Sequence, residues 1–219
     1  VPVIFIVRAV RKRRRLQEQH EKNKVFYEEF ETCSAALDEA YGDAAGAYAG
    51  LDSMRFVAED MDPVRTTHAA ALRKSAESKK ELADFLDAHN RGWRQADVAY
   101  GHWHMASEHM ALACQLYKQV VDERDKLLEM RRSVPDLIGD AKEKIDSLEE
   151  YIRMNADVDT MRAKELEELY RKLRELEDAF SVTLICWRAL ATKTGGLHKE
   201  IARLSEGAKA DVVLAERAR

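Results

Sequence analysis

Three histidines gather around Trp103 in a segment with helical periodicity, and imidazole is the commonest protein ligand for metal ions. A metal site on one helix needs histidines four residues apart with a carboxylate at ligand spacing, as in HExxH. His102 and His109 are seven residues apart and share a face, whereas His104 points elsewhere and Glu108 is not at ligand spacing. We therefore predict no metal or cofactor here. We interpret these histidines as half-buried structural residues, with a polar-aromatic partner surface as the functional alternative.

Other chemistry-bearing patterns are incomplete. The segment Asn155–Thr160 resembles the first half of an EF-hand loop, but its sixth position is Thr160 and its twelfth is Leu166, so the glycine bend and the bidentate glutamate are missing. Cys33, Cys114 and Cys186 are far apart without CxxC spacing. Phosphate-binding glycine loops and nucleophile elbows are also absent from the sequence. We therefore expect that the protein is not an enzyme.

The elements that would position these residues are long helices. Charged residues make up 35% of the 219 residues, with only 3 prolines and 9 glycines, which favours an all-α fold. Apolar residues at three- and four-residue spacing predict helices over 16–61, 64–132 and 136–216. Asp62-Pro63 and Ser133–Asp136 would supply the turns. This pattern predicts an elongated antiparallel three-helix bundle or coiled coil, spectrin-like in shape.

The third segment has a seam that includes Ile138, Ala141, Ile145, Leu148, Leu166, Leu169, Leu173 and Leu176. Its register continues over Gly195-Gly196, which we interpret as either a hinge or a weak point within a helix.

The predicted helices do not match in length. The first is roughly 68 Å long after the basic residues and the second is about 104 Å long. Either the second bends near Asn90–Gly92, or its later half packs only on the third helix. The second alternative would leave apolar positions for self-association or a protein partner: Trp103, Met110, Tyr117, Val121 and Leu128.

The first predicted helix also carries three glycines four residues apart, Gly42, Gly46 and Gly50. This spacing indicates either close packing within the bundle or an oligomer contact.

The N-terminal residues combine an apolar run, Val1–Val7, with a basic run: Arg11, Lys12, Arg13, Arg14 and Arg15. This order is typical of a transmembrane helix leaving the membrane on its cytoplasmic side, although spanning takes about 20 apolar residues. We expect residues 1–15 to be the end of such a helix followed by a basic run at the anionic membrane surface, and 16–219 to be a cytoplasmic bundle. The alternative is an ordinary amphipathic N-terminus.

The rest of the chain is acidic. Residues 1–15 hold six of the 36 basic residues, Arg8 and the five of the basic run, which leaves 30 basic against 40 acidic residues in 16–219. This net negative charge argues against nucleic-acid binding.

With its basic edge (Val3–Arg15) followed by about 200 residues of long helices, the chain resembles the cytoplasmic tails of bacterial membrane-anchored scaffolds. EzrA-like division regulators are one example, and actinobacterial receptors that recruit a gephyrin-like protein are another. The resemblance implies a single-pass protein of the cell membrane, with this region in the cytoplasm, that recruits a protein of the cell-division or polar-growth machinery. A homodimer is compatible with the same surface. The alternative function is a signal-relay coiled coil that transmits a change from an extracytoplasmic sensory domain.

Overall fold

The computed structural model describes residues 2–155, 160–180 and 184–218, and within these ranges the chain is helical, with no strand. The elements are α1 (Pro2–Glu28), α2 (Phe30–Ser53), α3 (Ala58–Asn90), the 3₁₀ turn η1 (Trp93–Gln95), α4 (Ala96–Met154), α5 (Thr160–Phe180) and α6 (Trp187–Ala218). The expected all-α class is therefore confirmed.

The chain divides into two compact units. Unit 1 comprises Val1–Ser53 and Pro63–Arg124, and unit 2 comprises Met54–Asp62 and Asp125–Arg219. Both α3 and α4 contribute residues to each unit.

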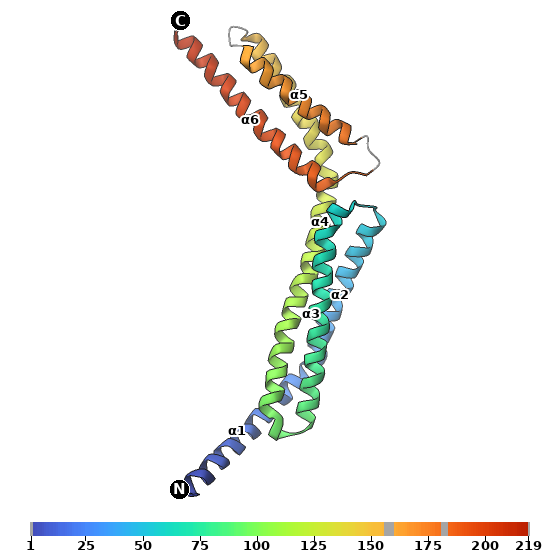
Figure 1. The fold of residues 1–219 in the computed structure, drawn as a ribbon, viewed down its shortest axis with the longest axis vertical. Coiled ribbons are helices and arrows are strands. Elements are labelled where there is room, and N and C mark those ends of the chain that lie inside the picture. The colour runs from blue at the N-terminus through green and yellow to red at the C-terminus, as the bar shows by residue number, and fades with distance from the viewer. Residues whose placement is uncertain (1, 156–159, 181–183, 219) are drawn as a thin grey trace. The chain divides into compact units, whose positions relative to one another are not determined.

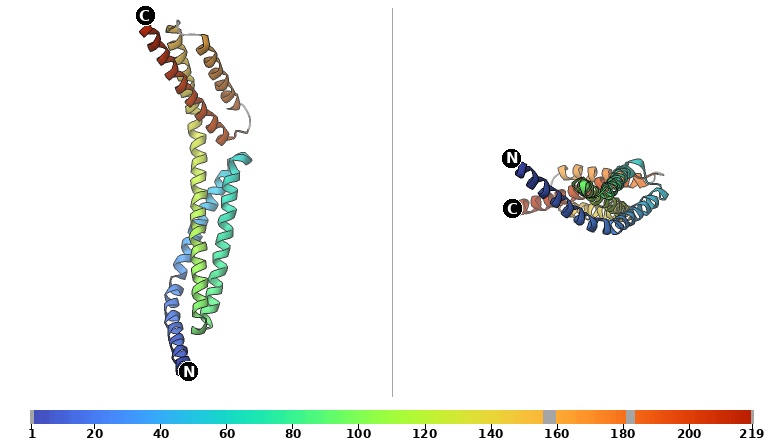
Figure 2. Two further views of the ribbon diagram at one scale, coloured as in Figure 1. Left: turned by 60° about the vertical axis from the view of Figure 1, so that its left-hand side comes forward. Right: turned by 90° about the horizontal axis from the view of Figure 1, so that it is seen from below.

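Unit 1 is built on an antiparallel hairpin of α3 and α4 (Figure 1). The hairpin turns at Gly92, whose φ of 89° ends the helix, because side-chain-bearing residues rarely adopt this conformation. The N–H of Gly92 donates to the His89 carbonyl at 2.9 Å. Figure 1 and the left view of Figure 2 show α2 and the later part of α1 alongside this hairpin, whereas the N-terminal part of α1 extends beyond the hairpin turn. The core cluster near the turn contains Leu82, Phe85, Ala88, Ala99, Trp103 and Ala106, with Phe26, Phe30, Cys33 and Leu86 packed against it.

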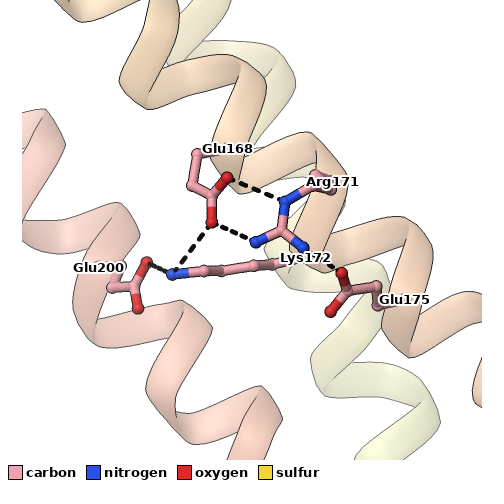
Figure 3. A network of polar contacts seen from close by, with 5 residues as sticks. All are labelled: Glu168, Arg171, Lys172, Glu175 and Glu200. Atoms are coloured by element: carbon pink, nitrogen blue, oxygen red, sulfur yellow. Dashed lines mark hydrogen bonds and ion pairs between the residues drawn. The ribbon is translucent and has the colours of Figure 1, made fainter.

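Unit 2 encloses one core between the later part of α4, α5 and α6. Its buried apolar residues are Val134, Ile138, Ala141, Ile145, Leu148, Leu166, Leu169, Leu173, Leu176, Leu190, Leu197, Ile201, Leu204 and Ala208. Outside this core, a charged network links α5 to α6 (Figure 3). In it, Lys172 Nζ lies 2.6 Å from a Glu200 oxygen and 3.9 Å from one of Glu168.

The first turn of α6 is held by a residue far away in the sequence. Asp60, which is fully buried, accepts hydrogen bonds from the backbone N–H groups of Trp187 at 2.8 Å and Arg188 at 3.0 Å. Its carboxylate therefore satisfies two of the amides that a helix N-terminus leaves without a partner.

The predicted helix bounds 16–61, 64–132 and 136–216 are wrong. Pro63 lies within α3 and Pro135 lies within α4, while the chain turns after Ser53 and after Asn90. Pro63 is the sixth residue of α3, so the helix loses only one hydrogen bond near its start. Near Pro135, the preceding residue Val134 and Ile138, one turn further along, are both buried in the core of unit 2. Burial of each aliphatic side chain is worth about 1.5–3 kcal/mol, which offsets a proline cost of about 3 kcal/mol.

The glycine predictions have different outcomes. Gly195 and Gly196 lie within α6, so the helix continues through them. A Cβ atom added to Gly42, Gly46 or Gly50 would have nothing within 4 Å, so the prediction of close helix packing at this face is wrong. The segment that resembles an EF-hand loop falls largely on 156–159, outside the described residues.

Candidate functional site

A cluster of ionisable side chains lies between α3 and α4 in unit 1, about three helical turns from Gly92. Nδ1 of His102 lies 2.6 Å from Oε2 of Glu81. Asp84, one turn further along α3, contributes a carboxylate oxygen, and the three potential ligand atoms all lie within 4.8 Å of one another. The Glu81 side chain is 15% exposed and the His102 side chain 32%. Two carboxylates and one imidazole at this spacing are a donor set suited to a divalent cation.

The hairpin explains why these residues meet. Glu81 precedes Gly92 by 11 residues and His102 follows it by 10, so an antiparallel pair that reverses at Gly92 places them side by side. A second contact lies next to it, where Nδ1 of His109 is 3.5 Å from a Glu77 oxygen. Glu77 is also paired with Lys74 at 2.6 Å.

Glu81 and Asp84 cannot be identified from helical spacing around the histidines, because these carboxylates lie on α3 whereas the histidines lie on α4. The signal that could have identified them is Gly92. A reversal there pairs residues at equal distances on its two sides, whereas a mere bend does not.

The contact of α1 with the hairpin turn is unusually polar. Asn23 is fully buried and donates to the Ala96 carbonyl at 2.9 Å. The rings of His20 and His89 stack with centroids 4.6 Å apart, and Nδ1 of each is buried and has no hydrogen-bond partner among the residues that the structure describes. Burial, and then the neighbouring His20 and Lys24, lower the pKa of His89, while Glu21 opposes this shift.

The basic run lies at the exposed N-terminal side of this contact. Arg11, Lys12, Arg13, Arg14 and Arg15 are all exposed. Arg15 forms an ion pair with Asp97 at 2.9 Å, Arg14 pairs with Glu18 at 3.1 Å, and the Arg13 guanidinium lies 5.6 Å from the centre of the Trp93 ring.

The residues of α4 that the sequence predicts as an exposed partner-binding surface are buried or half-buried in the structure. Trp103 is only 8% exposed and Tyr117 only 1%. Trp103 stacks on Phe26 at 5.2 Å, and the Tyr117 ring contacts Tyr41 of α2 at 5.8 Å. The expectation of exposure is wrong because the chain reverses at Gly92, so that α2 and α3 lie along this part of α4. The remaining predicted residues, Met110, Val121 and Leu128, are half-buried.

The outward face of α4 instead carries three other apolar side chains. Val98, Met105 and Leu112 are 49%, 47% and 40% exposed and follow one another at seven-residue spacing. Gly101 and Glu108, which lie between them on the same face, are also exposed. This set of three apolar residues is referred to below as the outer stripe. Seven-residue apolar spacing is the pattern by which one helix packs along another.

Unit 2 has a groove of about 640 Å³ between α4 and α6. Its lining mixes apolar residues such as Leu148 and Ile201 with charged residues such as Glu143 and Lys209. His198 also lines this groove, and its Nε2 donates a hydrogen bond to the Leu137 carbonyl at 2.9 Å, which links α6 to α4.

No helix in the described ranges is both long and apolar enough to cross a membrane. No protein-family model matches the chain, and no curated protein or solved structure matches it either.

Proposed function

We propose that this chain is the helical part of a membrane-associated adaptor, in which unit 1 binds a helix of a partner protein. The outer stripe carries this proposal. Val98, Met105 and Leu112 lie on one helix face at the spacing of a coiled-coil seam, and no other helix of unit 1 buries them. A partner helix from the cell-division or polar-growth machinery, such as one of a gephyrin-like protein, fits the resemblance described above.

The N-terminal part of α1 supports association with an anionic membrane surface. Ile6, Val7 and Val10 are exposed apolar residues, and the basic run Arg11–Arg15 follows them directly. Exposed apolar and basic residues combined on one helix bind the interface of anionic bilayers. A location at the cell membrane, with the helical units in the cytoplasm, is part of the same proposal. The spectrin-like character of the fold is also part of this proposal, since three helical segments surround the core of each unit.

The outer stripe is tested by photo-cross-linking in cells that produce the protein. A photoreactive amino acid placed at Met105 should yield a discrete adduct with a partner protein. The matched control places the same amino acid at Leu72, an equally exposed apolar residue on α3. The double substitution Val98→Asp, Leu112→Asp should abolish the Met105 adduct while leaving helicity unchanged. Equal adducts from positions 72 and 105, or an adduct that survives the double substitution, would contradict this role.

Membrane association is tested by sedimentation with vesicles. Vesicles containing anionic phospholipid should bind the chain, whereas neutral vesicles should not. Replacing Arg11, Lys12 and Arg14 with Gln should weaken binding roughly 100-fold, because each basic residue near the surface contributes about 1 kcal/mol. The control replaces three exposed basic residues elsewhere in unit 1, Arg73, Lys80 and Lys118. Equal loss in both variants would show that net charge, and not the N-terminal segment, determines binding.

A further inference from the structure

We propose that Glu81, Asp84 and His102 form a binding site for a divalent transition-metal ion that bridges α3 and α4. The donor set is one imidazole nitrogen, His102 Nδ1, and carboxylate oxygens from Glu81 and Asp84. Mixed nitrogen and oxygen donors suit Zn²⁺ and its neighbours, whereas Ca²⁺ and Mg²⁺ prefer oxygen alone. Three protein ligands leave a further position for water.

The spacing of the donor atoms is compatible with such an ion. All three lie within 4.8 Å of one another, and the closest pair, His102 Nδ1 and Glu81 Oε2, is 2.6 Å apart. Bonds of about 2.0–2.2 Å to a tetrahedral ion place its ligands about 3.4 Å from one another. Small side-chain rotations on two helices therefore suffice to separate the Glu81–His102 pair and admit the ion.

The local charge favours a cation. Among the described residues, Glu81 forms a hydrogen bond and ion pair with His102 alone, and the half-buried Asp84 carboxylate forms neither. No Lys or Arg in the described part of the chain pairs with either carboxylate. Two partly desolvated negative charges a few ångströms apart repel each other unless a cation lies between them.

The neighbouring pair of His109 and Glu77 provides an internal contrast. It repeats the imidazole–carboxylate contact one turn away along α3 and two turns away along α4, but Lys74 lies 2.6 Å from Glu77 and already neutralises it. The excess negative charge is therefore confined to Glu81 and Asp84, and we assign the metal to that cluster only.

The experiment measures Zn²⁺ binding to the chelator-treated chain by isothermal titration calorimetry. We expect one site, with Mg²⁺ and Ca²⁺ failing to compete at the same concentration. His102→Gln and Asp84→Asn should each weaken Zn²⁺ binding at least about 10-fold, because each removes a ligand. His104→Gln and His109→Gln are the matched controls and should leave the affinity unchanged.

A second measurement follows the fold. Because the ion would connect α3 to α4, Zn²⁺ at a hundredfold excess over its dissociation constant should raise the Tm of unit 1 by roughly 5–10 °C. Asp84→Asn breaks no hydrogen bond or ion pair within the described residues, so this variant should fold normally and lose only the Zn²⁺-dependent rise. Absence of saturable binding would overturn the proposal. Binding that is equal in the His102→Gln and His104→Gln variants would also overturn it, since the ion would then be adventitious.

Discussion

At the residue scale, the buried carboxylate of Asp60 has the largest expected effect on unit 2. Asp60→Ala would remove the carboxylate that accepts hydrogen bonds from the backbone amides of Trp187 and Arg188 in a part-buried position. We expect the free energy of unfolding of unit 2 to fall by about 2 kcal/mol, as for the loss of a helix cap with unsatisfied donors. Urea denaturation followed by circular dichroism measures this loss. Glu59→Ala, at the exposed adjacent position, should change the stability by less than about 0.5 kcal/mol.

The stacked histidines predict a pH dependence of unit 1. Burial lowers the pKa of His89, and burial also lowers that of His68, below the usual value of 6.5. The unfolded chain therefore binds more protons than the folded chain just below pH 6.5, and stability falls as the pH falls through this window. Two carboxylates of unit 1, Glu21 and Glu77, also have lowered pKa values, but both titrate below 4.5 and do not contribute in this window.

This dependence is measured as the Tm of unit 1 between pH 7.5 and roughly 5, a range that brackets the ordinary histidine pKa. His89→Phe, which keeps an aromatic ring against Phe85 and His20, should flatten the curve. His104→Gln, at an exposed position of α4, should leave the slope unchanged. A slope that persists in the His89→Phe, His68→Phe double variant would show that other groups cause it.

At the scale of single elements, α4 contains a proline that the helix tolerates and does not need. Pro135 is exposed, and its ring nitrogen cannot donate to the Arg131 carbonyl. Pro135→Ala should therefore stabilise unit 2 by about 2 kcal/mol, the helix gain of about 3 kcal/mol being partly offset by a more flexible unfolded chain. The midpoint of urea unfolding measures this change. Gly139→Ala, at an exposed site with open space around it, should add about 1 kcal/mol and serves as the comparison. A destabilised Pro135→Ala variant would indicate that the proline shapes α4 in a way that the core requires.

The same element shows what the sequence could and could not predict. The apolar seam at Ile138, Ile145 and Leu148 was predicted and is buried, because periodicity directly reports which face of a helix leaves water. The helix ends predicted at the prolines are wrong, because Pro63 and Pro135 lie within helices, and at Pro135 the burial of nearby apolar residues offsets the cost of the proline. The cluster of Glu81, Asp84 and His102 could not be predicted from any single helix, since it depends on which residues a reversal at Gly92 brings together.

At the scale of the whole molecule, the division into two units predicts two unfolding transitions. Each unit has its own core, around Phe85 in unit 1 and around Leu173 in unit 2. Phe85→Ala and Leu173→Ala should each lower the temperature of one calorimetric transition, at a cost of about 3–4 kcal/mol to that unit. The other transition should move far less. A single transition whose van't Hoff and calorimetric enthalpies agree would show instead that α3 and α4 couple the two units into one cooperative system.

The Asp60 contact also has a consequence for the rate of folding. The α3–α4 hairpin closes over a turn of a few residues, whereas the Asp60 carboxylate and the Trp187 amide are 127 residues apart in the sequence. Contacts between such distant residues form late, because the chain entropy lost on closing a loop grows with its length. An interaction absent from the transition state slows unfolding without accelerating folding. Asp60 therefore controls how long unit 2 stays folded, and has little influence on how quickly it folds.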